Sequence, residues 1–181
     1  IKVYRGFDQI GGCITEISTE TSRVFIDFGQ NLSGNGEPTT PEEDEALVTH
    51  ILAQNKKQHE AVFYTHGHED HVGLFEYIPE YVPQYMSEGT KGLLKIKYDV
   101  LYEGANLKVN QLLDIGCDSQ EYSDAINNLL YADNKCKLLN KIQVWKRTSP
   151  RKIPESICIG DIMITPFFNC HSIYDSHMFL I

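Results

Sequence analysis

The chain contains the stretch Thr65-His66-Gly67-His68-Glu69-Asp70-His71-Val72-Gly73, which directly follows the apolar run Ala61-Val62-Phe63-Tyr64. In an extended segment, residues two apart point to the same side, so His66 and His68 can bind one metal ion. Asp70 and His71 are displaced onto the next turn and can face a second ion. The spacing of these three imidazoles and one carboxylate therefore suggests a site for two metals.

The alternative is that these are surface histidines beside a solvated acid. A single histidine usually has that explanation, but four side chains of metal-ligand type at this spacing favour metal binding. A buried strand, a loop of ligands and then a helix also match the usual position of sites in α/β proteins, beyond the carboxyl ends of strands. Gly67 and Gly73 agree with this interpretation, because glycine lets the backbone approach a site closely.

Length and composition indicate one globular domain, since the chain has 181 residues of which 41% are apolar. No apolar run is long enough to cross a membrane, and the first residues lack the hydrophobic stretch of a signal peptide. We therefore expect no membrane partner and a cytoplasmic location. The formal charge of -9 gives no general attraction to nucleic acid, whose binding would need a local basic patch.

The five cysteines are scattered and form no Cys-x-x-Cys pair, which argues for reduced thiols rather than a disulfide framework. Cys170 stands beside His171 and offers one more metal ligand. The interpretation that we favour for Cys170 is a small, buried apolar side chain on a strand.

The first part of the chain predicts a hairpin and then a helix. Two β-rich runs, residues 13–18 and 23–29, flank a polar turn. Asp27 lies in the second run, and we expect it to support the metal ligands rather than to bind a metal itself. Thr40-Pro41-Glu42-Glu43 combines a capping box with proline at the first helical position, so a helix should run to about His59. Residues 61–64 then predict a buried strand, parallel to its neighbours.

The middle of the chain is less regular. Residues 74–78 predict a short helix, residues 83–87 a strand and residues 88–96 a small helix. From Lys97 to Lys141 the pattern is more polar, with one or two helices over residues 119–139. We interpret residues 97–141 as a helical insertion that shapes access of the substrate.

Sheet structure is expected to resume at residue 142. Residues 142–147 alternate in polarity, and residues 156–159 meet residues 162–165 across Gly160-Asp161, a two-residue turn typical of a hairpin. The second strand of this hairpin leads to His171, so a histidine again follows an apolar strand. A last strand is predicted over residues 177–181.

The stretch Thr65 to Gly73 resembles the HxHxDH signature of the metallo-β-lactamase superfamily, and every position of the signature is present. The run Ile26-Asp27-Phe28-Gly29 resembles the strand and turn that precede the signature in that superfamily. Within it, the run His171-Ser172-Ile173-Tyr174-Asp175-Ser176 is most similar to the ribonuclease J group, whose segment reads His-Ser-Ile-Pro-Asp-Ser. Tyr174 replaces the proline. The resemblance covers most of the chain outside residues 97–141.

The resemblance implies an αββα sandwich with two zinc ions, in place of which manganese or iron is an alternative. His66, His68 and His171 would bind the first ion, and Asp70 and His71 the second. The two ions would share a hydroxide, and Asp70 would also act in catalysis by orienting this nucleophile. Ser172 and Ser176 would contact a phosphate of the substrate, although serines beside a turn more often cap the local backbone.

The chain departs from the superfamily pattern at its end. The bridging aspartate and a further histidine ligand of the family lie beyond the third-histidine strand, and this chain stops ten residues after His171. The β-CASP and C-terminal domains of ribonuclease J have no counterpart in it either. We therefore expect residues 1–181 to form a partial metallo-β-lactamase domain, the N-terminal half of the sandwich, from a longer protein.

Three functions fit these features. The first is a zinc-dependent phosphodiesterase or ribonuclease that acts on RNA in the intact protein. The second is a hydrolase of small esters, thioesters or lactams with the same metal pair. The third is an inactive fragment, or an interaction domain that forms a homodimer through exposed strands.

Overall fold

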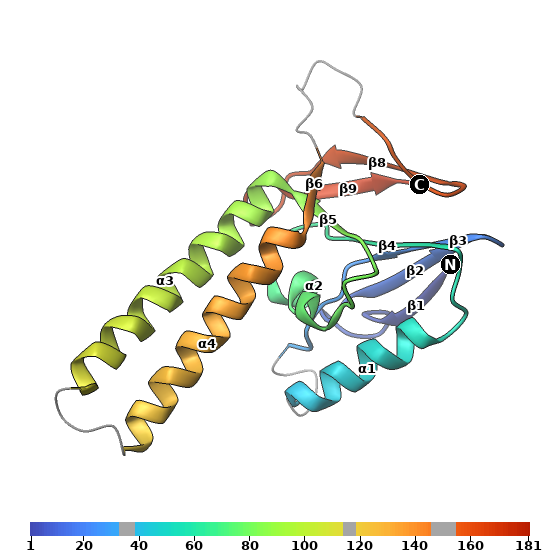
Figure 1. Cartoon of the computed structure of the whole chain (residues 1–181). Helices are drawn as coiled ribbons and strands as arrows, with labels where there is room; N and C mark the ends of the chain where they lie inside the picture. The colour runs from blue at the N-terminus through green and yellow to red at the C-terminus, as the bar shows by residue number, and fades with distance from the viewer. Residues whose placement is uncertain (33–38, 114–118, 146–154) are drawn as a thin grey trace. The chain divides into compact units, whose positions relative to one another are not determined.

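The computed structural model describes residues 1–32, 39–113, 119–145 and 155–181 (Figure 1). The chain divides into two compact units. The first contains residues 1–90 and 142–181 and holds every described strand, and the second is the helical segment of residues 91–141. The predicted α/β fold class is confirmed.

The larger sheet of the first unit has six strands in the order β1-β2-β3-β4-β5-β6. Its strands are β1 (Lys2–Arg5), β2 (Ile14–Ser18), β3 (Ser22–Ile26), β4 (His59–Phe63), β5 (Gln84–Ser87) and β6 (Gln143–Trp145). Strands β1 to β3 are antiparallel, and β3 to β6 are parallel. The predicted hairpin and the predicted parallel strand before the histidine motif are thereby confirmed. The prediction for residues 146 and 147 lies outside the described residues.

The smaller sheet is an antiparallel meander of β7 (Ile157–Ile159), β8 (Ile162–Phe168) and β9 (His177–Leu180). The predicted hairpin across Gly160-Asp161 is confirmed, and Gly160 has a φ of 58°, a left-handed conformation that glycine adopts without strain. The last predicted strand is confirmed as β9.

The two sheets pack face to face around one apolar core. It contains Val24, Ala61, Phe63, Trp145, Ile159, Ile162 and Ile164. Side chains alternate along a strand, so Val24 points toward the smaller sheet while its neighbours Arg23 and Phe25 point to the opposite face. Helix α1 lies on that opposite face, as Figure 1 shows, and Arg23 donates there to the carbonyl of Leu52. The first unit therefore has the layers helix, sheet and sheet.

Helix α1 spans Pro41–Ala53 and begins with the predicted capping box. Thr40 accepts a hydrogen bond from the backbone of Glu43, whose side chain accepts one from the Thr40 backbone. The prediction that this helix continues to about His59 was wrong. Gln54 is already extended and Asn55 has a left-handed φ of 44°, because the chain must turn there to enter β4.

The chain between β4 and β5 forms helix α2 (Glu69–Val72) and a single 3-10 turn over Phe75–Tyr77, at the place of the predicted short helix. Helix α3 (Glu88–Leu113) was predicted too short, because its small apolar stripe is diluted by exposed polar residues. Helix α4 (Gln120–Lys141) is one continuous helix.

The second unit has its own small core, formed between α3 and α4. Val109, Leu112 and Ala125 are buried there, with Tyr122, Ile126 and Leu129 packed against them. That residues 97–141 are an insertion relative to a family fold stays a prediction. Within the described residues, no helix combines the length and the apolar character that crossing a membrane requires.

Candidate metal centre

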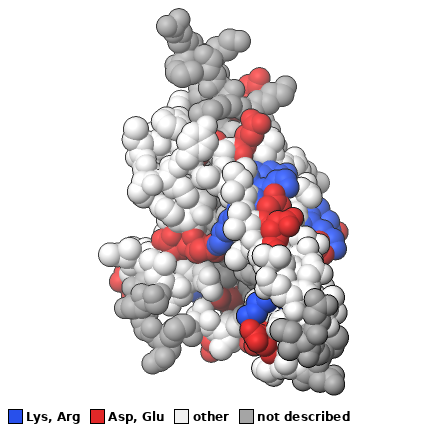
Figure 2. Space-filling model, turned by 90° about the vertical axis from the view of Figure 1, so that its left-hand side faces the viewer, with Lys and Arg blue, Asp and Glu red and all other residues white. Residues whose placement is uncertain are grey.

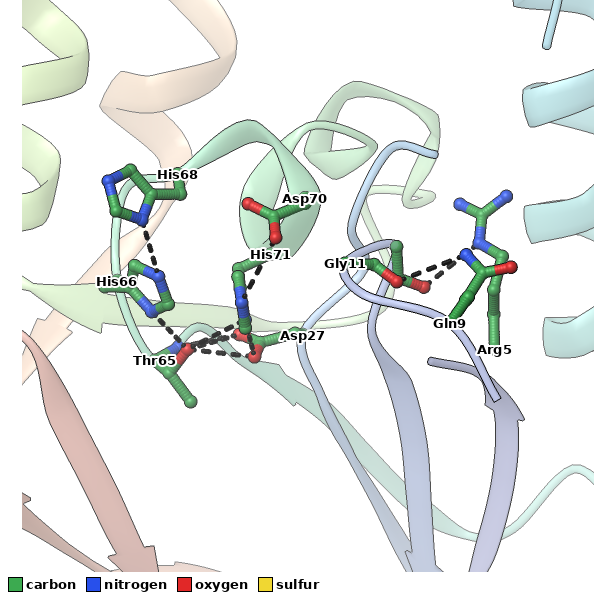
Figure 3. Close-up of polar contacts among 10 residues, drawn as sticks. Arg5, Gln9, Gly11, Asp27, Thr65, His66, His68, Asp70 and His71 are labelled. Atoms are coloured by element: carbon green, nitrogen blue, oxygen red, sulfur yellow. Dashed lines mark hydrogen bonds and ion pairs between the residues drawn. The ribbon is translucent and has the colours of Figure 1, made fainter. Parts of the chain in front are cut away.

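The histidine motif begins where β4 ends, at the carboxyl end of the parallel strands. The backbone is extended at His68, which is the residue before α2, and becomes helical at Glu69. The extended part brings the two alternate histidines together, with Nε2 of His66 3.0 Å from Nδ1 of His68 (Figure 3). This is the local geometry that the spacing of the motif predicts.

His171 reaches the same place from the loop after β8. Its ring centroid lies 4.6 Å from that of His66 and 5.6 Å from that of His68. One ligand nitrogen from each of the three histidines lies within 4.8 Å of the other two. Three imidazoles that converge in this way fit a zinc ion that keeps a fourth position open.

The protonation state of His66 also fits a metal ligand. Burial and the neighbouring histidines His71, His68 and His171 lower its pKa to about 3. The ring is therefore neutral at physiological pH, and only a neutral imidazole nitrogen can bind a metal.

Hydrogen bonds determine which nitrogen of His66 is available. Nδ1 of His66 lies 2.8 Å from the Thr65 hydroxyl, and that hydroxyl lies 2.9 Å from Asp27 Oδ2. Since a carboxylate only accepts, the Thr65 hydroxyl donates to Asp27, and its oxygen accepts a hydrogen bond from the N–H group at Nδ1 of His66. Nε2 of His66 is then left without a proton and faces His68.

Asp70 and His71 lie beside this trio. The centroid of the His71 ring is 4.0 Å from that of His66, and His71 Nε2 is 3.6 Å from Asp70 Oδ2. Figure 3 shows the Asp70 carboxylate above His71, with His66 and His68 to the left of them. The structure thus places all five predicted ligands at one end of the larger sheet.

Asp27 contacts the second pair, Asp70 and His71, through a hydrogen bond with His71. Its carboxylate is buried, with 3% exposure, and accepts hydrogen bonds from the Thr65 backbone at 2.7 Å and from His71 Nδ1 at 2.7 Å. The second bond fixes the His71 ring with Nε2 toward Asp70. Asp27 therefore orients His71. Among the described residues, the group whose ligand atoms converge contains His66, His68 and His171, and Asp27, Asp70 and His71 all lie outside it.

The charges of this pair are linked. Burial raises the pKa of the Asp27 carboxyl, and the hydrogen bonds from His71 and Thr65 oppose that rise. Burial lowers the pKa of His71, but the hydrogen bond and charge of Asp27, together with Asp70, outweigh this and leave it raised. The hydrogen bond between Asp27 and His71 thus favours the charged form of each partner, against the burial that disfavours it.

The backbone of Glu69 to His71 is bound to two other segments. Cys13 and Phe28 donate backbone hydrogen bonds to the carbonyls of Asp70 and His71, each at 2.9 Å. A Cβ on Gly29 would lie 1.7 Å from the Asp70 carbonyl oxygen, so only glycine fits there. No sequence pattern indicated the hydrogen bonds of Cys13 to Asp70 and of Thr65 to Asp27, because both join segments that are distant along the chain.

The predicted substrate serines lie in different surroundings. Ser172 is exposed, whereas Ser176 is 2% exposed and its carbonyl accepts from the Asn169 backbone at 2.9 Å.

The prediction that Cys170 is a buried side chain on a strand was wrong, because Cys170 is exposed and follows the end of β8 at Phe168. The turn toward His171 has already taken the backbone out of the sheet at that point.

A cavity of about 440 Å³ opens beside the histidines. Its polar side includes Thr65, His66, His71, His171 and Ser176, and its apolar side includes Ile17, Ile26, Phe179 and Ile181. The cavity gives a substrate access to the candidate ligands and offers it apolar contacts as well as polar ones.

Comparison with known proteins gives a distant likeness. No family model matches the chain. The transcription termination factor FttA of Thermococcus kodakarensis is 29% identical over 97 residues, which are 50% of this chain and 15% of that protein. FttA of Pyrococcus abyssi is 28% identical over 95 residues, which are 49% of this chain and 14% of that protein. The chain therefore spans about a seventh of the length of these relatives, and the low identity indicates only a distant common superfamily.

The fold is also found in a solved structure. A protein of unknown function from Enterococcus faecalis V583 matches with a TM-score of 0.58 and 18% identity, over 98% of this chain and 39% of that one. At this identity the likeness concerns the fold alone, and it extends to both sheets and the helical segment.

Proposed function

We propose that this chain forms part of a zinc-dependent hydrolase of the metallo-β-lactamase type. The observation that carries the proposal is the convergence of His66, His68 and His171, with ligand nitrogens within 4.8 Å, next to the carboxylate and imidazole of Asp70 and His71. His66, His68 and His171 would bind the first ion, and Asp70 and His71 would supply part of the site for a second. Manganese or iron is the alternative to zinc.

The residues of the chain have separate roles in this proposal. When bound, zinc supplies a Lewis acid that stabilises negative charge developing on the attacked centre. Asp70 would orient the attacking water, and Asp27 would keep His71 turned toward Asp70. Ser172 and Ser176 would contact the substrate from the His171 loop.

The proposed substrate is RNA, cleaved at a phosphodiester bond. The likeness to two transcription termination factors supports a nucleic-acid substrate for the whole protein. On the face shown in Figure 2, Lys and Arg side chains are interspersed with Asp and Glu, and the described part of that face has no continuous basic surface. Contacts to RNA would therefore come mainly from the metal centre and its rim, or from parts of the protein beyond this chain.

The cavity supports a second candidate, the hydrolysis of small esters, thioesters or lactams. Its apolar side, which includes Ile17, Ile26 and Phe179, suits a small substrate with an apolar group.

Self-association is the remaining candidate, because β9 is an edge strand on which Met178 and Leu180 are exposed.

The test uses the full-length protein that contains this chain. Cleavage of single-stranded RNA and of a small ester is measured with and without added zinc, and again with His68→Ala. The proposal expects zinc-dependent RNA cleavage that His68→Ala abolishes, whereas His50→Ala, a change at an exposed histidine of α1, leaves it intact. Zinc-dependent cleavage of the ester alone would favour the second candidate, and cleavage of neither would contradict the proposed activity.

A further inference from the structure

The loop that carries His171 is fixed at its base by backbone hydrogen bonds. Asn169 donates to the carbonyl of Ser176 at 2.9 Å, which closes the loop. His177, the first residue of β9, donates to the carbonyl of Thr65 at 2.9 Å. The base of the loop is therefore joined to the segment that carries His66 and His68.

The His171 side chain itself is held less firmly than the other candidate ligands. His66 and His71 are bound by Thr65 and Asp27, whereas the exposed His171 ring makes no hydrogen bond within the described part of the chain. Its place beside His66 must then be determined by the conformation of its loop.

Asp175 is the residue that fixes this loop to a second point. It is buried, with 3% exposure, and its Oδ2 atom accepts a hydrogen bond of 2.8 Å from the backbone of Gly89, the second residue of α3. A carboxylate is favoured at this place, because the first backbone N–H groups of a helix lack partners within the helix. The carbonyl of Asp175 accepts a further bond of 3.0 Å from the Ser87 hydroxyl at the end of β5.

The backbone at Asp175 is strained, and the start of α3 approaches it closely. Its φ is 60°, a left-handed conformation that residues other than glycine, asparagine and aspartate rarely adopt. A Cβ on Gly89 would lie 2.4 Å from the Asp175 Cβ, so the helix start can approach the loop only because residue 89 is glycine. The strain is maintained by the hydrogen bonds on both sides of the residue.

We propose that Asp175 is a positioning residue for the metal centre, which sets the place of His171 by fixing its loop to the junction of β5 and α3. This inference rests on the proposed function, in which His171 is the third ligand of the first ion. Residues that orient metal ligands without touching the metal typically change metal affinity 10-fold to 100-fold when they are replaced.

Three substitutions separate the side chain from the backbone strain. Asp175→Asn keeps an oxygen acceptor and a residue that tolerates the left-handed conformation. Asp175→Gly keeps the conformation and removes the acceptor, and Asp175→Ala removes both. Zinc affinity is measured by competition with a chromophoric chelator, and the absorption of the cobalt-substituted protein reports the number of ligands.

The proposal expects Asp175→Asn to bind zinc nearly as tightly as the unaltered protein, and Asp175→Gly and Asp175→Ala to bind it roughly 10-fold to 100-fold more weakly. Equal affinity in Asp175→Gly and the unaltered protein would overturn it. Thr40→Ala is the matched control, since it removes a hydrogen bond at the start of another helix, α1, and should lower the melting temperature without changing zinc affinity.

Circular dichroism shows whether each variant folds. If Asp175→Gly does not fold, Ser87→Ala replaces it, because this change removes only the bond to the Asp175 carbonyl and the bond of the same hydroxyl to the Thr90 backbone. Unchanged zinc affinity in Ser87→Ala would then overturn the proposal. Absence of zinc binding in the unaltered protein would instead contradict the proposed function itself, so the two failures are distinguishable.

Discussion

Strand β3 has a buried charged residue near its start and another just after its end, and the two have opposite surroundings. Arg23 is fully buried and is paired with Glu60 at 2.7 Å, with Glu16 at 3.8 Å and with the carbonyls of Leu52 and Gln54. Asp27, just after the other end, accepts hydrogen bonds from Thr65 and His71. These two residues lie beside a group of histidines in which the ring nitrogens of His66 and His68 face each other.

The region around Arg23 is closed. The guanidinium binds the last carbonyls of α1, which otherwise lack partners, and two acidic side chains balance its charge. Tyr4 donates to Glu16 at 2.9 Å, and burial together with Glu16 raises the pKa of Tyr4 to about 12, so this hydroxyl stays protonated and continues to donate. These groups find their partners within the protein, and the region serves to join α1 to the sheet.

The histidine end is open by contrast. Thr65 and Asp27 fix the outer nitrogens of His66 and His71, and the remaining nitrogens converge on one another and on Asp70. These converging nitrogens and the Asp70 carboxylate offer lone pairs to a common region, which a metal cation could fill. A buried polar group can thus either stabilise the fold, as Arg23 does, or orient side chains that could bind a ligand, as Asp27 does.

The largest expected effect on stability comes from replacing Arg23, the buried cation near the start of β3. Arg23→Met leaves Glu16 and Glu60 with uncompensated charges in a buried region, so the free energy of unfolding should fall by about 3–5 kcal/mol. Equilibrium unfolding in urea measures this free energy. Lys2→Met is the matched control, since Lys2 binds the exposed side chain of Gln54 and its loss should change stability by less than about 0.5 kcal/mol. A similar, small loss in both variants would show that the Arg23 network is not the main support of α1.

A smaller effect is expected from Asp27→Asn at the open end. The amide keeps the shape of the carboxylate but loses its charge, so the pKa of His71 should fall and zinc affinity should fall about 10-fold. In the zinc-free protein, the pair stabilises the fold below the ordinary histidine pKa of about 6.5, and this stability is lost as the pH rises through the raised pKa of His71.

Nuclear magnetic resonance titration of His71, with unfolding measured between pH 5 and pH 9, checks both parts of this prediction. The variant should show a lower His71 pKa and a flatter dependence of stability on pH. An unchanged pKa would mean that Asp27 does not control the charge of His71.

The smallest effect is expected at an exposed carboxylate. Asp161 accepts hydrogen bonds from Thr19 at 2.8 Å and Thr21 at 3.0 Å, and hydrogen bonds from Ser22 and these threonines lower its pKa to about 2. Its contribution to stability is complete above the unfolded-state pKa of about 3.9 and is lost as the pH falls through about 2. Asp161→Asn should therefore lose less stability on acidification from pH 5 to pH 2 than the unaltered protein. Parallel acid unfolding curves would contradict this.

Local patterns predicted the parts of the fold that depend on neighbouring residues. The capping box at Thr40, the turn at Gly160-Asp161 and the ligand spacing from His66 to His71 each act within a few residues, and each gave the correct local structure. The hydrogen bond between Asp27 and His71 agrees with the supporting role expected for Asp27, which stays a prediction, and its contact with Thr65 was not expected from the sequence.

The parts that were missed depend on distant contacts. At the end of α1 the carbonyl of Gln54 accepts a hydrogen bond from Arg23, which is 31 residues away, and in the loop of His171 the Asp175 carboxylate accepts one from Gly89, which is 86 residues away. The length of α3 was underestimated because only a narrow stripe of that helix is buried. Such features follow from the folded arrangement and leave no periodic signal in the sequence.

We propose that the histidine group beyond the end of β3 binds a metal, whereas the Arg23 region at its start does not. The most direct test is the amount of zinc retained after equilibrium dialysis by the unaltered protein and by His68→Ala, His171→Ala and Arg23→Met. We expect at least one zinc ion per chain in the unaltered protein and in folded Arg23→Met, and none at the same free zinc concentration in the two histidine variants. Full zinc occupancy in His68→Ala or His171→Ala would contradict it.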